Sequence, residues 1–348
     1  NDTYQIYRAH TSLSNAEAGT INSTLSTMGF AAFNGGNRDL VANNEQWNIA
    51  CYANGTTADA TAVWINGWIT NAQNFIKAYT PVNANEVGTS QRHSGKWDDG
   101  KYRVSAAGYG VISASQNDVV IDGIQIELTG STNDHRGFST FNSDNITLKN
   151  CILKTGLRGL RPGINGDPNP EGDQYYYNNI IYGFNRGVAV GQYNGRYYIY
   201  NNTVYDCDYG YSSSAGNDNK EVTVKNNIAQ NCTDGYYAQV QTFSSSSDYN
   251  ISDLVADAPG ANSKNLTTVN FIDATNKNFC LSSDDTAAKG AGVNLSTDVN
   301  LSFTDDIRGQ SRPASPNPWS IGTCEALDAK KIKLEGTQIK MEGDVKFE

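Results

Sequence analysis

The chain has 348 residues and a formal net charge of −10, and only 18% of its residues are charged. Its 33 Gly and 20 Tyr, together with abundant Asn, Ser and Thr, indicate a β-rich chain with many turns, because helical proteins carry more Ala, Leu, Glu and Lys. The acidic balance argues against nucleic acid or an anionic membrane surface as a partner, and no apolar run reaches the length of a transmembrane segment.

Residues 1–46 are predicted to cap the fold that follows. Within them, Ser14–Glu17 matches a capping box and leads into Ile21, Leu25 and Met28, which predicts a short helix. Such a helix would cover a strand edge that is otherwise open to pairing with another chain. The chain begins without a methionine, which fits an exported protein whose signal segment has been removed. We therefore expect an extracellular protein, either secreted, surface-associated or on a virion surface.

Short strand-like runs come next, separated by turn residues. They lie at 47–52, 62–65, 75–79, 102–105 and 119–126. A repeat of the form X-Asn-Asn-Ile/Thr then begins. The second positions of its five copies are Asp122, Asn150, Asn178, Asn201 and Asn226, which lie 28, 28, 23 and 25 residues apart. Nine residues after each of these asparagines comes a glycine, and the four are Gly159, Gly187, Gly210 and Gly235.

A repeat of about 25 residues with several short strands is typical of one coil of a solenoid, because each coil can bury its apolar face only against its neighbours. The sequence therefore predicts an all-β, right-handed, single-stranded parallel β-helix over 47–326. Stacked asparagines at a corner would exchange hydrogen bonds along an inward-facing column. The glycines would mark a second corner that requires a positive φ or a close approach of the backbone.

In its Asn-Asn-Ile/Thr core and its asparagine column, the repeat resembles that of the right-handed parallel β-helix superfamily, which includes pectate-lyase-like proteins and phage tailspikes. The segment Trp319–Glu325 is similar to the end of the β-helix domain in uncharacterised secreted or viral members. This resemblance implies the fold and says little about the chemistry, because one fold hosts many functions.

Two long loops on consecutive coils, 129–144 and 161–174, are predicted to form a functional wall. In a polysaccharide lyase, Arg or His would take the proton beside a uronate carboxylate, while cations or acid-bound Ca²⁺ neutralised that carboxylate; in a hydrolase, two acids would flank the glycosidic bond. The alternative is that these loops are solvated and linked by ion pairs. The candidate residues are Asp134, His135, Arg136, Arg158, Arg161, Asp167, Glu171 and Asp173.

No metal site is expected, because three histidines in polar contexts do not make a ligand cluster, and no cofactor is expected beyond Ca²⁺ in the case of a lyase. Aromatic rings on an outer strand face would suit stacking on sugars, although tyrosines also stack in a solenoid without any ligand. The candidates for carbohydrate binding are Tyr175, Tyr177, Tyr193, Tyr198 and Tyr200.

The six cysteines permit three disulfides in an exported protein. Cys207 and Cys232 share one position on adjacent coils, which predicts a bridge between them, with a pair of buried thiols as the alternative. Cys280 and Cys324 are candidates for closing the C-terminal coil.

Residues 327–348 differ in composition from the rest of the chain and are predicted to form a C-terminal strand extension. Three copies of an apolar-Lys-apolar-Glu pattern read as short strands with one apolar face, which require a partner surface on the last coil or on another subunit. The apolar residues are Ile332, Leu334, Ile339, Met341, Val345 and Phe347.

The sequence thus favours a non-catalytic, structural or adhesive extracellular subunit that self-assembles through its terminal strands into a homo-oligomer or a polymer, such as a filament, a surface layer or a virion spike. The alternative function is a polysaccharide lyase or glycoside hydrolase that acts on an acidic glycan at 129–144 and 161–174. Glycans are candidate partners in both cases.

Overall fold

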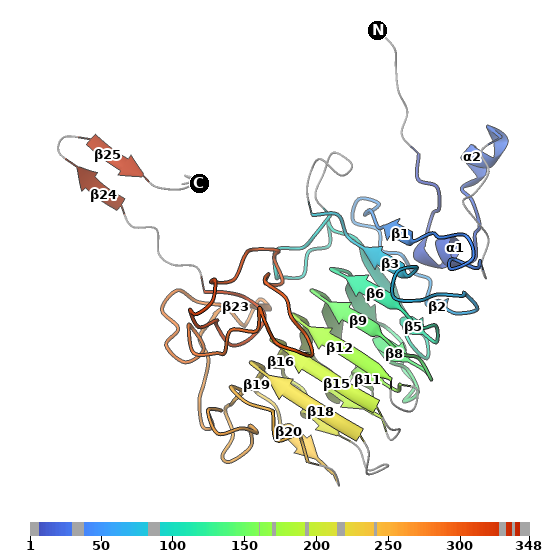
Figure 1. The fold of residues 1–348 in the computed structure, drawn as a ribbon. Coiled ribbons are helices and arrows are strands. Elements are labelled where there is room, and N and C mark those ends of the chain that lie inside the picture. Colours follow the sequence, from blue (N-terminus) through green and yellow to red (C-terminus); the bar gives the residue numbers. More distant parts are fainter. Residues whose placement is uncertain are drawn as a thin grey trace.

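In the computed structural model, the chain forms a parallel β-solenoid followed by a segment that runs back along its side (Figure 1). None of the helices in the described part of the chain is long and apolar enough to cross a membrane. The structure describes residues 7–29, 38–82, 91–159, 161–168, 172–191, 195–213, 220–239, 242–326, 332–335 and 338–341.

The solenoid consists of three seven-stranded sheets in which all neighbouring strands are parallel, and from β3 to β20 the chain visits the sheets in the order first, second, third in each turn. The predicted fold is therefore confirmed. The first sheet contains β1 (Trp47–Ala50), β3 (Ile76–Tyr79), β6 (Val119–Asp122), β9 (Ile146–Lys149), β12 (Asp173–Tyr177), β15 (Gly195–Tyr200) and β18 (Lys220–Lys225). The second contains β4 (Arg103–Ala106), β7 (Gln125–Leu128), β10 (Ile152–Thr155), β13 (Ile180–Tyr182), β16 (Thr203–Tyr205), β19 (Ile228–Gln230) and β21 (Ile251–Ser252). The third contains β2 (Val63–Ile65), β5 (Ile112–Ala114), β8 (Phe138–Thr140), β11 (Pro162–Gly166), β14 (Arg186–Val190), β17 (Tyr209–Ser213) and β20 (Asp234–Ala238).

The second asparagine of each repeat forms a ladder inside the solenoid. Asn179 Nδ2 donates to Asn202 Oδ1 over 3.0 Å, and Asn202 Nδ2 donates to Asn227 Oδ1 over 3.1 Å. Each of these side-chain oxygens also accepts the backbone N–H of the asparagine one coil earlier, as Asn202 Oδ1 does from Asn179 over 2.9 Å. Because every amide is buried and bonded in both directions, the ladder leaves no polar group in the core without a partner at this corner.

The first asparagine of each repeat stands in a second column, in which Asn178 Nδ2 donates to Asn150 Oδ1 and Asn226 Nδ2 donates to Asn201 Oδ1, each over 3.2 Å, as predicted for the column. Asn150, Asn178, Asn201 and Asn226 turn the corner with φ between 52° and 56°, in the left-handed region that asparagine tolerates better than most residues. Three of them, Asn178, Asn201 and Asn226, hydrogen-bond to Asp305, Ser320 and Val293 of the C-terminal region, which lies outside the solenoid. The expectation that this column faces the interior is therefore wrong, because the positive φ changes which side of the strand the side chain lies on.

In the first copy of the repeat, the strand pairing differs by one residue from the alignment that the sequence predicts, which places Asp122 beside Asn150. Asp122 pairs with Lys149, so that Gly123, with φ of 76°, occupies the place of Asn150. The glycine column also differs from the prediction, because β11 pairs with β14 so that Gly163, not Gly159, stands beside Gly187. A Cβ on Gly163, Gly187 or Gly210 would lie 2.5–2.8 Å from the carbonyl oxygen of the next glycine in the column, so close backbone approach is the reason for these residues.

Residues 253–326, here called the returning segment, cover the outer faces of the first two sheets. Phe303 and Trp319 pack on Tyr177 and Tyr200 of the first sheet, and the second sheet is covered in the same way. The segment contains only one hairpin, between β22 (Phe271–Asp273) and β23 (Asn278–Leu281).

A disulfide between Cys280 and Cys324, with 5.1 Å between the Cα atoms, holds the returning segment together and confirms that predicted bridge. The predicted bridge between Cys207 and Cys232 is wrong, because both residues are buried free thiols. Side chains stacked on successive parallel strands keep the strand spacing of about 4.8 Å, whereas a disulfide requires about 3.5–4.5 Å between Cβ atoms.

The two ends of the solenoid are covered differently. At the first coil, the N-terminal segment forms α1 (Leu13–Glu17) and α2 (Ser23–Thr27) instead of one helix. The cap of α1 is Ser12, whose side chain accepts the N–H of Asn15, so the capping box expected at 14–17 is wrong. At the last coil, the N–H groups of Ser244 and Asp248 donate to carbonyls of β18. The last strand edge of the first sheet is therefore closed by the chain itself.

Two further strands, β24 (Ile332–Glu335) and β25 (Gln338–Met341), form a separate antiparallel pair. The predicted assembly residues Val345 and Phe347 lie outside the described residues.

Replacing Asn202 by leucine should lower the free energy of unfolding by about 3 kcal/mol or more, because the buried N–H of Asn179 and the carbonyl of Tyr176 would both lose a partner. The matched control is Asn43→Ala, which removes one bond from an exposed turn and should cost less than about 1 kcal/mol. Chemical denaturation measures both values, and equal losses would contradict the role of the ladder.

Candidate functional site

Of the residues predicted to form a site, the structure brings together Arg136 and Asp167. Arg136 precedes β8, and Asp167 follows β11 on the next coil, where its N–H donates to Thr140 Oγ1 over 2.7 Å. The charge of Arg136 acts on the carboxyl group of Asp167. The site therefore lies on the third sheet. The tyrosines and isoleucines that the returning segment covers belong to the first and second sheets.

Three aromatic rings accompany this pair, and the sequence reasoning missed all of them. Trp64 is 58% exposed and Tyr109 is 50% exposed, and both rings pack against Phe141 with centroid distances of 6.1 and 5.0 Å. The guanidinium carbon of Arg136 lies 4.0 Å from the centroid of the Tyr109 ring. We call Trp64, Tyr109, Arg136, Phe141 and Asp167 the third-sheet site.

The sequence did hold a signal for these rings. In the run 62–65, Trp64 alternates with the inward-facing Val63 and Ile65, so the strand period puts a large ring on the outer face.

The carboxyl group of Asp167 has an altered acidity. Partial burial raises the pKa of Asp167 to about 6, and the positive charge of Arg136 limits the rise. A carboxyl group with this pKa is neutral in mildly acidic solution and charged above it. It can therefore donate a hydrogen bond in one state and accept a proton in the other.

Unsatisfied polar atoms gather at the same place. Among the buried side-chain polar atoms of the described chain that lack a hydrogen-bond partner, four belong to His135, Arg136, Ser139 and Asp167. Buried polar atoms without a partner are uncommon in folded proteins, and they occur where water or a ligand completes the bonding. The pair of Arg136 Nε and Asp167 Oδ1 thus offers one donor and one acceptor beside exposed rings.

The other predicted residues are engaged elsewhere. Arg161 is buried and its guanidinium donates to backbone carbonyls that include Thr132 and Leu157, so it ties two loops together. Arg158 forms ion pairs with Asp206 and Asp208, two coils further along.

Two further acidic candidates that the structure describes do not contribute a side chain to the third-sheet site. Asp173 pairs with Arg196 over 2.6 Å on the first sheet. Asp134 is exposed, and its carbonyl oxygen accepts from Arg136. Glu171 lies outside the described residues. Residues that lie near the same long loop in the sequence thus have side chains on different sheets.

The tyrosines predicted to bind carbohydrate do not form an open platform. Tyr177 and Tyr200 are buried beneath the returning segment, and the Tyr177 ring packs on Phe303 with a centroid distance of 4.7 Å. Tyr175 and Tyr198 stack on each other at 5.5 Å, with Tyr198 only 6% exposed. Tyr193 lies outside the described residues.

Among the described residues, no group of three His, Cys, Asp or Glu side chains is arranged to hold a metal ion. At the third-sheet site in particular, Asp167 is accompanied by a cation, Arg136, which would oppose the binding of another cation.

No family model matches the chain, and no curated protein matches it significantly. Among solved structures, the crystal structure of pectate lyase Pel9A is similar with 12% sequence identity and a TM-score of 0.33, over 81% of this chain and 87% of that chain. At this level the likeness carries no argument about activity. The assignment to the parallel β-helix architecture rests on the strand pairing described above.

The carboxyl group of Asp167 should titrate near pH 6, and Arg136→Ala should move the titration to higher pH, because the charge that favours the carboxylate is lost. Carbon-13 NMR of the aspartate carboxyl groups measures both values. The control is Arg158→Ala, which removes a cation from a different site. Titration of Asp167 in the ordinary aspartate range, near 4, would contradict the burial of this group.

Proposed function

We propose that this protein is an extracellular carbohydrate-binding protein that holds an acidic glycan at the third-sheet site. The observation that carries the proposal is the coincidence of an unpaired buried Arg136 Nε and an unpaired buried Asp167 Oδ1 with the exposed rings of Trp64 and Tyr109. Aromatic faces suit the apolar side of a sugar ring. A guanidinium suits a carboxylate, to which it can donate two parallel hydrogen bonds.

The geometry suggests separate roles for these residues. Trp64 and Tyr109 would supply stacking area, and Arg136 would select a uronate carboxylate. Asp167 would set the pH dependence, because its carboxylate repels the carboxylate of the glycan above about pH 6 and its neutral form can donate a hydrogen bond below that pH. Affinity for an acidic glycan should therefore increase as the pH falls through about 6.

A second candidate function, polysaccharide lyase, is favoured by the raised pKa of Asp167 alone, since a general base works best with a pKa near the working pH. Asp167 would take the proton from the carbon beside the uronate carboxylate. The glycosidic C–O bond on the neighbouring carbon would then break, a C=C bond would form, and the leaving oxygen would take a proton from water. Arg136 would neutralise the charge that develops on the carboxylate.

Binding can be measured by isothermal titration calorimetry with uronate oligosaccharides at pH 5 and at pH 8. Arg136→Ala should weaken binding by about 10- to 100-fold, because a hydrogen bond to a charged group contributes about 1.5–3 kcal/mol. Arg158→Ala serves as the matched control and should leave the affinity unchanged, since Arg158 pairs with Asp206 and Asp208 away from the site. Equal losses in the two variants would reject the site.

Asp167→Asn should bind an acidic glycan at pH 8 as tightly as the unmodified protein does at pH 5, because the amide is neutral at both values. Neutral oligosaccharides should show no change in affinity across this range. The same samples distinguish the two functions, because a lyase forms unsaturated ends that absorb in the ultraviolet and loses this activity in Asp167→Asn. Tight binding without new ends would leave the binding function standing and exclude the lyase.

A further inference from the structure

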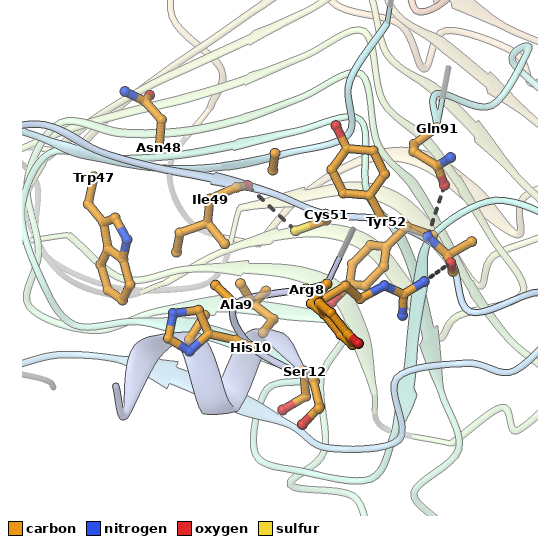
Figure 2. A pocket seen from close by; sticks show the side chains of 17 residues that line it. Arg8, Ala9, His10, Ser12, Trp47, Asn48, Ile49, Cys51, Tyr52 and Gln91 are labelled. Atoms are coloured by element: carbon orange, nitrogen blue, oxygen red, sulfur yellow. Dashed lines mark hydrogen bonds between the residues drawn. The ribbon is translucent and has the colours of Figure 1, made fainter. Parts of the chain in front are cut away.

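A cavity of about 520 Å³ lies at the first coil of the solenoid (Figure 2), at the opposite end from β18 and β20 (Figure 1). One wall is β1 and the turn that follows it, and the other wall is the run from Tyr7 to Leu13 that leads into α1. Figure 2 shows Arg8, Ala9, His10 and Ser12 on the side of this space that lies across from the strand. None of these residues belongs to the third-sheet site.

One wall of the cavity is the outer edge of β1. Among the described residues, β1 is the first strand of its sheet and its paired neighbour is β3. On the β3 side, the N–H groups of Trp47 and Cys51 donate to Phe75 and Tyr79 over 3.0 and 2.8 Å. In a parallel ladder, alternate residues bond to opposite sides, so the backbone groups of Asn48 and Ala50 point into the cavity. Within the described chain, neither residue has a backbone partner on that side.

The cavity has the form of a slot for one added strand. Apolar side chains contribute to its lining, with Leu13, Ala16 and Cys51 buried and Ile49 half-buried, and polar residues that include Arg8 and His10 line the rest. Its far end is closed at Ala53, whose carbonyl accepts from Arg8 and whose N–H donates to Gln91. The open part thus runs along β1 itself, which is four residues long. A strand with an apolar residue at every second position would satisfy the edge and fill the slot.

The chain carries a strand pair with this pattern. β24 and β25 are four residues long, like β1, and within the described residues they pair with each other alone, which leaves an outer edge on each. Their sequences, Ile332-Lys333-Leu334-Glu335 and Gln338-Ile339-Lys340-Met341, alternate polar and apolar residues. Strands of this kind require an apolar surface on one side. The last coil does not offer a free edge in its first sheet, because Ser244 and Asp248 close it.

We propose that the strand pair of one copy of this chain adds to the free edge of β1 in a second copy, through the slot between β1 and the run Tyr7–Leu13. The two surfaces differ, so the contact is heterologous, and repetition builds a ring or an open filament. This assembly uses neither Arg136 nor Asp167, so a test of assembly and a test of glycan binding are independent of each other.

Two full-length variants test the contact from its two sides. Ala50→Pro removes the N–H that points into the slot and leaves the β1–β3 bonds, which belong to the neighbouring residues. Leu334→Pro/Ile339→Pro disrupts the donor strands. In sedimentation velocity over a concentration series, the unmodified chain should associate, and each variant should remain a monomer with an unchanged circular dichroism spectrum. A monomeric unmodified chain, or undiminished association of either variant, would overturn the proposal.

Mixing the two variants gives a sharper result. Ala50→Pro keeps an intact donor strand and Leu334→Pro/Ile339→Pro keeps an intact slot, so the mixture should form a one-to-one dimer that cannot grow. A mixture that stays monomeric while the unmodified chain associates would contradict a heterologous contact through these two surfaces.

Disulfide trapping keeps the test valid if the proline variants fail to fold. Full-length Ala50→Cys and Leu334→Cys chains, mixed and mildly oxidised, should yield a cross-linked dimer that an excess of the peptide 332–341 suppresses at least tenfold. The matched control replaces Ala50→Cys by Val299→Cys, because Val299 is 95% exposed and lies outside the slot. Equal cross-linking in the control would overturn the proposal.

Discussion

The structure depends on the need to satisfy buried amide groups at one corner of every coil. The ladder of Asn179, Asn202 and Asn227 meets this need by passing each hydrogen bond to the next coil, so that no coil is satisfied alone. A ladder of this kind is cooperative, because removing one member leaves partners without bonds above and below. The spacing of the coils, their parallel register and the tight glycine column follow from keeping the amides in line.

The same repeat also decides which outer faces are available to ligands. After the inward asparagine, the next residue points outward, and Ile152, Ile180 and Ile228 make the second sheet apolar on its outside. Such a face requires a cover, and the returning segment provides it while also burying Tyr177 on the first sheet. The third sheet is the one on which large rings stay exposed, at Trp64 and Tyr109. Beside Trp64, the matching outward positions on the next coils of this sheet are the polar residues Ser113, Ser139 and Asn165, so this face has no column of isoleucines for the returning segment to cover.

The sequence predicted the solenoid because the period of the repeat is a local property, visible in the spacing of Asn178, Asn201 and Asn226. It did not predict which asparagine faces inward, since that depends on a positive φ at the corner. It also missed the covering of the tyrosines, because Phe303 and Trp319 lie more than 100 residues beyond Tyr177 in the chain.

The candidate site shows the same limits. Arg136 and Asp167 were among the predicted residues, but so were Arg161 and Arg158, and composition alone could not separate a buried clamp from an open side chain. A buried and an open side chain differ in the direction in which they point, and that direction depends on where the neighbouring strand begins or ends. Trp64 and Tyr109 were missed because they precede the regular repeats, where the coil spacing is uneven and strand parity is the one usable signal.

The path of the returning segment also determines how the molecule would carry a load. Cys324 is bonded to Cys280 beside Gly95, in the loop between β3 and β4, and the neighbouring Thr323 donates to Thr203 of β16, so the end of the returning segment is attached along the side of the solenoid. A force applied to the C-terminal strands would reach the solenoid through this disulfide and through the bonds of Arg312 to Asn178 and Glu325. It would therefore shear many hydrogen bonds at once, whereas a force on the last coil would peel its strands away one at a time.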